Sequence, residues 1–334
     1  MQISRKDFKK YEQTKEKEHK KSIKEAFLNN YYESLEYINF LKKVSGINMK
    51  IKKFAHKPFF IARKKLPSIC FYEKNLAKVL KEQKIHFLMV EDKPNNSDLN
   101  QSILEYSLIL KKSYIEAKKE YKRSFNDALK QSKRYKINTK IYKKPSKDCI
   151  SQVYKFYKRQ MIELNSFVLP KKMFFEFLKC FALRLFIVFK EFEIRDFKED
   201  SLENNSQDLK KFEEKIIAYC LCFENSDNLY CSIGGSLKKY FNYKATNVLY
   251  DEIIKYGCSK ELNIHLGLGQ KGFGYSRFKE NAGATNYRCN VFPDNTKVLN
   301  LYSKISKLKL TGLLLRIYSF LFPKKLIYML IPMS

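Results

Sequence analysis

The residues whose types and spacing suit binding chemistry are concentrated between Tyr230 and Cys289. Eight of the ten glycines lie in this stretch, namely Gly234, Gly235, Gly257, Gly267, Gly269, Gly272, Gly274 and Gly283. Between Gly46 and Gly234 the sequence has none. Glycine is used where the backbone takes a positive φ or where another group approaches closely. The distribution indicates either a shaped binding pocket or a series of tight turns between strands.

One run of these glycines, Gly267-Leu-Gly269-Gln-Lys-Gly272, has the G-x-G-x-x-G spacing found in dinucleotide-binding proteins. In those proteins the run opens a helix near the start of a βαβ unit, and an acid follows about twenty residues later. The segment that follows here, GFGYSRFK, is expected not to be helical, and no further set of parallel strands is predicted after it. The spacing therefore does not indicate a dinucleotide site.

Cysteine and histidine spacing indicates neither a metal site nor a disulfide framework. The eight cysteines include no C-x-x-C pair, and the four histidines are scattered. Cys220, Cys222 and Cys231 fall within predicted strands. We therefore expect a reduced, cytoplasmic chain without a bound metal. The first residues, MQISRKDFKK, lack the apolar core of a secretory signal.

A hairpin, a helix and a further strand are expected to position the glycine-rich stretch. Ile216–Cys222 and Leu229–Ile233 are rich in β-branched, aromatic and cysteine residues and are joined by a polar turn. Asn247–Tyr256 is predicted as a helix that ends at Gly257, and Glu261–Leu266 as the next strand. Two helices and a strand are predicted upstream, over Ile150–Leu164, Lys171–Ala182 and Leu183–Glu191.

The N-terminal half shows a looser version of this order. Strands are predicted over Asn48–His56, Phe59–Ala62 and His86–Val90, with a helix over Tyr72–Gln83. A long helix is expected from about Asp98 to Lys133, because apolar residues from Tyr114 to Ala128 recur at spacings of three and four. The polar segment Lys198–Lys211 lacks a core pattern and is expected to be a loop insertion.

The order of motifs in the glycine-rich stretch resembles that of a known family. A hairpin ending in IGGS, a helix, YGC leading into a strand, and G-x(2)-Y-x-R-F-K-x(3)-G-A follow one another up to Ala284. Upstream, KKEYKRSFNDALKQSKRYKI is similar to an R-x-x-I-x-x-A-x-K helix. Together these motifs resemble the Fem-type (FemABX-like) aminoacyltransferases of the GNAT acyltransferase superfamily, over residues 35 to 290. The pair Phe278-Lys279 is the most recognisable part.

The resemblance implies an α/β (α+β) fold of two tandem GNAT-like domains, each a mixed, mostly antiparallel sheet flanked by helices. The expected parts are a charged helical segment at 1–30, an N-terminal GNAT-like domain ending in a long basic helix at 31–144, a C-terminal GNAT-like domain at 145–295, and a basic amphipathic tail at 296–334. The apolar runs of the tail are shorter than the ~20 residues of a spanning helix. They predict either a helix in the membrane interface or a helix packed on the domain.

The chemistry implied by the resemblance is the attack of a neutral amine on an activated ester or thioester carbonyl. The protein has to position both partners and stabilise the oxyanion, and a strong general base is optional. We expect Lys279 to stabilise the charge, with Arg277 and Tyr275 as its neighbours. The alternative for Lys279 is an ordinary surface lysine.

A second group of residues is expected to bind the donor or its phosphates. Its members are Arg123, Lys238, Lys239, Tyr243, Lys244, Phe278, Gly272 and Gly274. Arg123 lies on the basic helix, where the alternative is a solvated face, and arginine can bind a phosphate bidentately. GNAT enzymes bind acyl-CoA with a glycine turn at a helix N-terminus, but KKYFNYKAT precedes the helix here. This difference favours aminoacyl-tRNA as the donor; the alternative for the residues before the helix is a surface loop.

Composition favours polyanionic partners. Lys and Arg total 66 against 35 acidic residues, a formal charge of +31, which suits nucleic acid, an anionic membrane or nucleotide-linked substrates. A lysine-rich compositional bias is the alternative explanation.

These observations predict a monomeric cytoplasmic enzyme, located at the inner face of the membrane, with no tightly bound cofactor. Its co-substrate would be aminoacyl-tRNA or acyl-CoA, and its acceptor an amino group of a nucleotide- or lipid-linked peptidoglycan or surface-polysaccharide precursor. Two alternatives stay open: an acyl-CoA-dependent amino-sugar N-acyltransferase, and a non-catalytic RNA-binding protein that uses the basic helix.

Overall fold

A computed structural model describes the chain in segments. The described residues are 14, 17–22, 25–26, 50–54, 57–61, 68–71, 87–94, 104–164, 166, 168–179, 183–193, 212–270 and 274–292. The predicted insertion at 198–211 and the basic tail at 296–334 lie outside them, as does most of the segment at 1–30. No helix among the described residues is long and apolar enough to cross a membrane.

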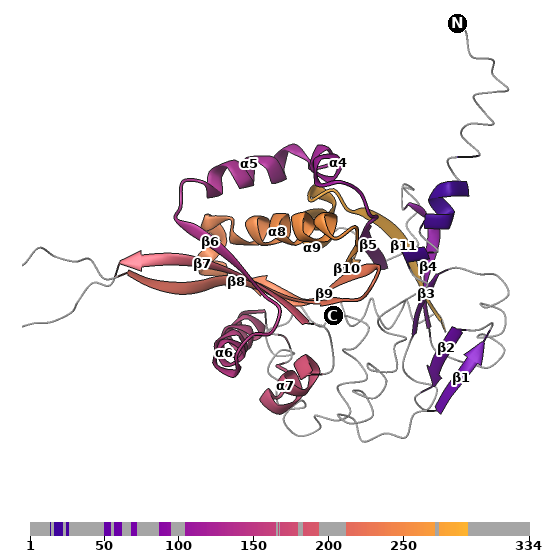
Figure 1. The fold of residues 1–334 in the computed structure, drawn as a ribbon, viewed down its shortest axis with the longest axis horizontal. Coiled ribbons are helices and arrows are strands. Elements are labelled where there is room, and N and C mark those ends of the chain that lie inside the picture. Colours follow the sequence, from indigo (N-terminus) through magenta and orange to yellow (C-terminus); the bar gives the residue numbers. More distant parts are fainter. Residues whose placement is uncertain are drawn as a thin grey trace, which may run out of the picture.

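Nine strands form one mixed sheet in the order β3-β4-β11-β5-β10-β9-β8-β7-β6 (Figure 1). Their bounds are β3 Ser68–Phe71, β4 Phe87–Pro94, β5 Leu104–Ile109, β6 Ile137–Tyr142, β7 Leu183–Glu193, β8 Phe212–Glu224, β9 Asn228–Ser236, β10 Asn263–Gln270 and β11 Thr285–Phe292. Only the pairs β3-β4 and β9-β10 run parallel within this described sheet. A separate hairpin joins β1 (Lys50–Phe54) to β2 (Lys57–Ile61). The predicted α/β fold with a mostly antiparallel sheet is confirmed.

The two halves of the chain interlock within this sheet. Strand β11, from the C-terminal half, lies between β4 and β5 of the N-terminal half, and β5 in turn pairs with β10. The sheet is therefore continuous across the boundary predicted at residue 144.

Helices cover both faces of the sheet (Figure 1). On one face lie α4 (Tyr114–Lys119), α5 (Arg123–Ser132), α8 (Ala245–Ser259) and α9 (Gly274–Asn281), and on the other α6 (Lys147–Glu163) and α7 (Lys171–Lys179). Alternating strand residues supply both cores: Leu185 and Ile187 of β7 pack on the α6 side, and Phe186 and Val188 on the α8 side. Two layers of helices thus enclose a sheet that is apolar on both faces.

The long helix expected from Asp98 to Lys133 is wrong. The chain forms β5 at Leu104–Ile109, then α4 at Tyr114–Lys119 and α5 at Arg123–Ser132. The capping box of Ser113 and Glu116 starts α4, and the chain leaves the helical path before α5. The three-and-four spacing of apolar residues does mark one buried face, because Ala117, Tyr121 and Phe125 all pack in the same core, but it does not show the break.

The expectation that GFGYSRFK is not helical is also wrong, because Gly274–Asn281 forms α9. Gly267 and Gly269 lie inside β10 rather than in a turn after it. In a dinucleotide-binding protein the glycines form the turn between a strand and the helix that follows it. The position of these two glycines therefore still argues against a dinucleotide site.

Candidate functional site

Strands β9 and β10 diverge after a short parallel contact. Their pairing covers three residues of β10, Asn263 to His265. Beyond that point β9 continues along β8 to Ser236, while β10 continues along β5 to Gln270. A bulge between His265 and Gly267 turns β10 at this position, and Gly267 has a φ of +78°, which glycine adopts at no steric cost. Beyond His265, β9 and β10 no longer pair with each other, so a side chain or a ligand can approach the backbone of β10 from the β9 side.

Lys279 of α9 reaches this point of the sheet. Its side chain is buried, with 6% of the residue exposed. Nζ donates to the main-chain carbonyl of Leu268 at 2.9 Å and to that of Gly267 at 3.2 Å. Burial lowers the pKa of the Lys279 ammonium to about 8, against the opposing effect of neighbouring cysteines. The alternative of an ordinary surface lysine is therefore wrong.

Two glycines hold α9 against the sheet. A Cβ at Gly269 would collide with the hydroxyl of Ser276, so the helix approaches β10 as closely as it does only because residue 269 is glycine. Gly283 has a φ of +84° and follows the helix, and the amide of Ala284 donates to the carbonyl of Lys279 at 3.1 Å. This is the usual glycine ending of a helix. It fixes the backbone of Lys279 in the last turn of α9.

A buried polar cluster beside α9, centred on Asn286, is not predicted from the sequence. The side-chain amide of Asn286 donates to Glu280 of α9 at 3.0 Å and to Glu105 of β5 at 3.4 Å. Ser107 donates to the amide oxygen of Asn286 at 2.6 Å. Glu105 is only 3% exposed. Because Glu105 and Ser107 are about 180 positions from Asn286 in sequence, no local pattern brings them together.

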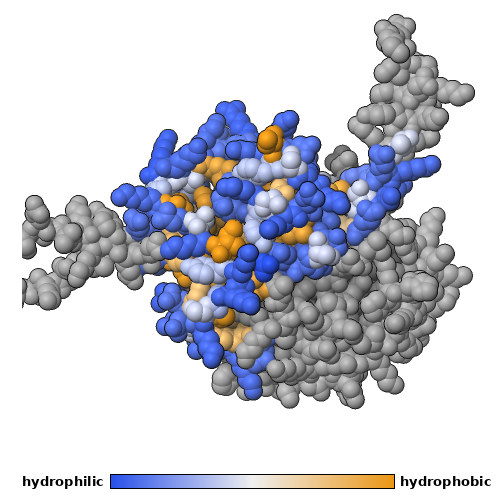
Figure 2. All heavy atoms as spheres, in the orientation of Figure 1, coloured by the Kyte–Doolittle hydropathy of each residue, from blue (hydrophilic) through white to orange (hydrophobic). Residues whose placement is uncertain are grey.

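The basic helix α5 packs against α9. The Phe278 ring lies 5.8 Å from that of Phe125 on α5 and 5.0 Å from that of Tyr250 on α8. Lys122 pairs with Glu280 at 3.3 Å. Phe278, expected to bind the donor, thus lies between helices. Arg123 lies at the start of α5, with its side chain 96% exposed and 3.6 Å from Asp127. The described surface is mainly hydrophilic in the view of Figure 2, with smaller hydrophobic areas between.

The other predicted donor-binding residues gather where β9 leads into α8. Lys238 and Lys239 begin a short 3₁₀ helix, η2 (Lys238–Tyr243), and both are exposed. Tyr243 packs edge-on against Tyr135 at 5.0 Å and accepts the Lys190 ammonium over its ring. Lys244 takes a left-handed φ of 57° and directly precedes α8. The helix N-terminus is therefore flanked by basic side chains.

The remaining predicted residues lie at the start of α9. Arg277 and Gly274 are exposed, and the ring of Tyr275 is 47% exposed with the Lys279 ammonium 5.8 Å from its centroid. Gly272 lies outside the described residues. The structure thus brings Tyr275 and Lys279 together, while the side chain of Arg277 points to a solvent-accessible surface.

The thiols of Cys220 and Cys222 on β8 and of Cys231 on β9 converge on the side of the sheet that α8 covers. Sγ of Cys222 lies 3.6 Å from that of Cys220 and 3.7 Å from that of Cys231. Hydrogen bonds from the other two thiols, and the positive charge of Lys279, hold the pKa of the Cys231 thiol well below its usual range, whereas burial raises the pKa of the Cys222 thiol. The absence of a C-x-x-C pair concealed this cluster, because two members alternate along β8 and the third lies opposite on β9.

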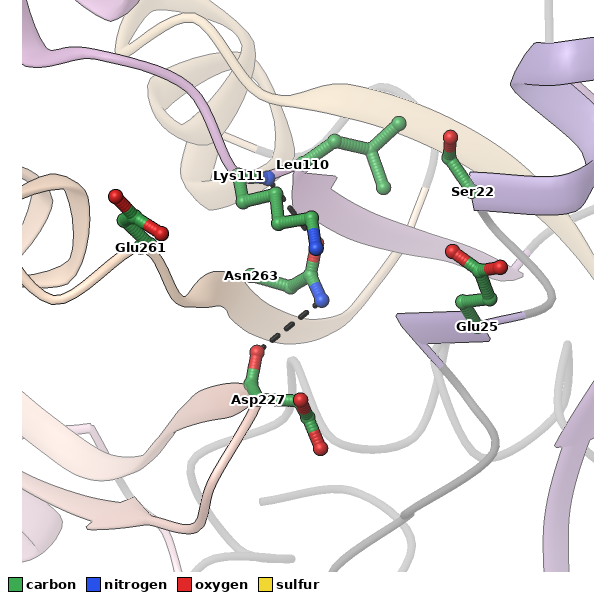
Figure 3. Close-up of a pocket in the computed structure, with 7 residues that line it drawn as sticks. All are labelled: Ser22, Glu25, Leu110, Lys111, Asp227, Glu261 and Asn263. Carbon is green, nitrogen blue, oxygen red and sulfur yellow. Dashed lines mark hydrogen bonds between the residues drawn. The ribbon is translucent and has the colours of Figure 1, made fainter.

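A pocket of about 390 Å³ lies at the opposite end of β10, where the strand begins (Figure 3). It is lined by Ser22, Glu25, Leu110, Lys111, Asp227, Glu261 and Asn263. Asn263 connects its sides, since its side chain accepts from the Lys111 amide at 3.0 Å and donates to the Asp227 carbonyl at 3.1 Å. None of the residues predicted for the site lines it.

Comparison with solved structures finds similarity of fold at low sequence identity. The crystal structure of FemX aligns with 92% of this chain and 99% of its own, at a TM-score of 0.53 and 9% sequence identity. L-PGS from Bacillus licheniformis aligns with 82% of this chain and 96% of its own, at 0.45 and 7%. A tandem GNAT protein from the clavulanic acid biosynthesis pathway aligns with 64% of this chain and 66% of its own, at 0.34 and 7%.

The alignment with FemX confirms the Fem-type fold that the sequence motifs predict. The other two TM-scores are too low to add to that assignment. No protein-family model and no curated protein matches the sequence.

Proposed function

We propose that this protein is an N-acyltransferase that moves an aminoacyl group from aminoacyl-tRNA to an amino group of a peptidoglycan or surface-polysaccharide precursor. The observation that carries the proposal is the buried ammonium of Lys279 at the divergence of β9 and β10. The likeness of the fold to FemX supports it, since the motif that resembles the Fem-type enzymes includes this lysine.

The reaction is an aminolysis of an ester. The acceptor amine forms a bond to the acyl carbon, the bond from that carbon to the ribose oxygen of the donor breaks, and the amine proton ends on the released hydroxyl. Negative charge develops on the acyl oxygen in between. An ammonium has three N–H donors, of which Lys279 gives two to Gly267 and Leu268, and we assign the third to the acyl oxygen.

The position of Lys279 suits this task electrostatically. A hydrogen-bond donor acts more strongly in a dry site than in water, because the local dielectric constant is low. The two carbonyls hold the ammonium in one place before the substrate arrives, so little reorganisation is needed as charge develops. With a pKa of about 8 the group is mostly protonated at neutral pH.

The donor's phosphates have a basic surface to bind. Lys238, Lys239 and Lys244 precede α8, whose N-terminal amides and dipole attract anions. The segment from Lys111 to Lys144 adds thirteen basic residues against three acids. A long polyanion such as tRNA has enough phosphates to contact both regions, which supports aminoacyl-tRNA as the donor.

Two other functions are distinguishable. An acyl-CoA donor would use the same Lys279 but needs fewer phosphate contacts. A non-catalytic RNA-binding protein would need lysines exposed to phosphates, and the burial of Lys279 does not serve that role. Placement at the inner membrane face belongs to the same proposal, because a lipid-linked acceptor would be found there.

The test uses the full chain with radiolabelled aminoacyl-tRNA or acetyl-CoA and a mixture of cell-wall precursors as amine acceptors. We expect label from aminoacyl-tRNA to appear on an amine, and the Lys279→Met variant to transfer it far more slowly. Transfer of label from acetyl-CoA alone would show that the donor is an acyl-CoA and not aminoacyl-tRNA. Tight RNA binding without transfer from either donor would favour the RNA-binding alternative.

A further inference from the structure

Three cysteines of the core beside the site, Cys220, Cys222 and Cys231, converge on one point. Cys220 and Cys222 alternate along β8 and so project from the same face, while Cys231 pairs directly with Cys222 across the β8-β9 ladder. Their ligand atoms all lie within 4.8 Å of one another. All three residues are at most 7% exposed.

The spacing of the sulfur atoms matches that around a tetrahedral zinc ion. Zn–S bonds of about 2.3 Å at tetrahedral angles place two sulfurs about 3.8 Å apart. The Sγ separations from Cys222 are 3.6 Å and 3.7 Å, so binding would need only small adjustments. Thiolate sulfur is a soft ligand that selects zinc or Cu(I) over hard cations.

Charge balance favours zinc over Cu(I). Three thiolates and Zn²⁺ carry a net charge of −1, and the ammonium of Lys279, which acts electrostatically on Cys220 and Cys231, brings the total to zero. With Cu(I) the same group would retain one negative charge. An uncompensated charge in a buried site is costly.

The geometry points to a zinc site formed by the thiolates of Cys220, Cys222 and Cys231, with the Lys279 ammonium as the balancing charge. On binding, three S–Zn bonds form, the S–H bonds of those cysteines that are still protonated break, and their protons pass to solvent. The fourth position is left for a water molecule, since the described residues offer no fourth cysteine, histidine or acid there. This inference does not depend on the proposed acyl transfer.

The experiment titrates the reduced, full-length protein with Zn²⁺ and, as a spectroscopic probe, with Co²⁺. We expect one ion per chain and the strong thiolate-to-cobalt absorption of a tetrahedral site. Cys222→Ser should lose that absorption, because Cys222 contacts both other sulfurs. Cys149→Ser is the matched control and should retain it, since Cys149 is a free thiol on α6, away from the cluster.

A second measurement keeps the test valid if Cys222→Ser folds poorly. Zn²⁺ should raise the Tm of the wild type and of Cys149→Ser, but not that of Cys220→Ser or Cys231→Ser. Lys279→Met should bind zinc about tenfold more weakly, as expected for the loss of an outer-shell charge. The inference is overturned if the wild type shows no thiolate-to-cobalt absorption, if Cys222→Ser binds as the wild type does, or if only Cu(I) binds.

Discussion

The ammonium of Lys279 donates a 2.9 Å hydrogen bond to the main-chain carbonyl of Leu268, and this bond joins α9 to β10 just beyond the divergence of β10 from β9. A long flexible side chain is thereby fixed at both ends, by the helix and by the strand. Two main-chain carbonyls hold the cationic group in one position, and a fixed charge is the arrangement that electrostatic catalysis requires.

Asn286 is predicted to stabilise the position of α9. Asn286→Ala removes the amide that donates to both Glu280 and Glu105, and we expect the free energy of unfolding to fall by about 1–3 kcal/mol. Urea denaturation checks this value. Asn242→Ala, at an exposed position of η2, is the control; equal losses in both variants would contradict a specific role for the Asn286 amide.

Gly269 of β10 and Gly274 of α9 are predicted to respond oppositely to replacement by alanine. A Cβ at Gly269 would overlap Ser276, so Gly269→Ala should cost about 1–3 kcal/mol of unfolding free energy. Nothing lies within 4 Å of a Cβ at Gly274, so Gly274→Ala should be neutral or stabilising by up to about 1 kcal/mol. Thermal unfolding of the two variants tests the contrast, and an unchanged Tm for Gly269→Ala would show that α9 can shift.

His265 is predicted to destabilise the fold in acid. It is 1% exposed, with Nδ1 2.9 Å from the Tyr106 hydroxyl and Nε2 3.0 Å from the side-chain amide of Asn228. Burial lowers its pKa from 6.5 to about 3. As the pH falls below 6.5, the unfolded chain takes up a proton that the folded chain does not, so stability present above pH 6.5 is lost towards pH 3.

The slope of this loss is about 1.4 kcal/mol per pH unit. Urea denaturation at pH 7, 6 and 5 measures it, and His265→Gln should show a correspondingly shallower dependence because glutamine does not titrate. Parallel curves for the wild type and the variant would show that the imidazole is not the group responsible.

The lysines before α8 are predicted to act on donor binding. Replacing Lys238 and Lys239 by glutamate should raise KM for the polyanionic donor and reduce the salt dependence of binding, because each phosphate contact releases a counterion. The fold should be unaffected, since both side chains are exposed. Lys260→Glu, at the far end of α8, is the control. A KM that changes as much in the control would indicate only the effect of net charge.

The sequence predicts the C-terminal half of the fold well because its signals are local. The order of helices and strands from α6 to β10 matches the expected one, since strand residues such as Leu221 alternate with the opposite face and apolar residues such as Ile253 recur with helical spacing. The helix predicted over Leu104–Ile109 is wrong, because a short strand buried on both faces has no polar alternation that would distinguish it from the helical pattern next to it.

The site is less predictable than the fold. Lys279 stands out through its motif, but its burial depends on Gly269, which admits α9 to the sheet. Asn286 meets Glu105 through the insertion of β11 beside β5, and the pairing of Cys231 with Cys222 depends on strand register. These contacts are set by tertiary topology, which residue spacing does not encode.

The central claim is that the Lys279 ammonium stabilises the acyl oxygen in the transition state. The direct measurement is single-turnover transfer from radiolabelled aminoacyl-tRNA, comparing the wild type with Lys279→Met and with Lys260→Met as the surface control. The rate constant at saturating donor should fall about 10²–10³-fold in Lys279→Met, with little change in donor affinity and none in the control. An unchanged rate constant in folded Lys279→Met would contradict the claim.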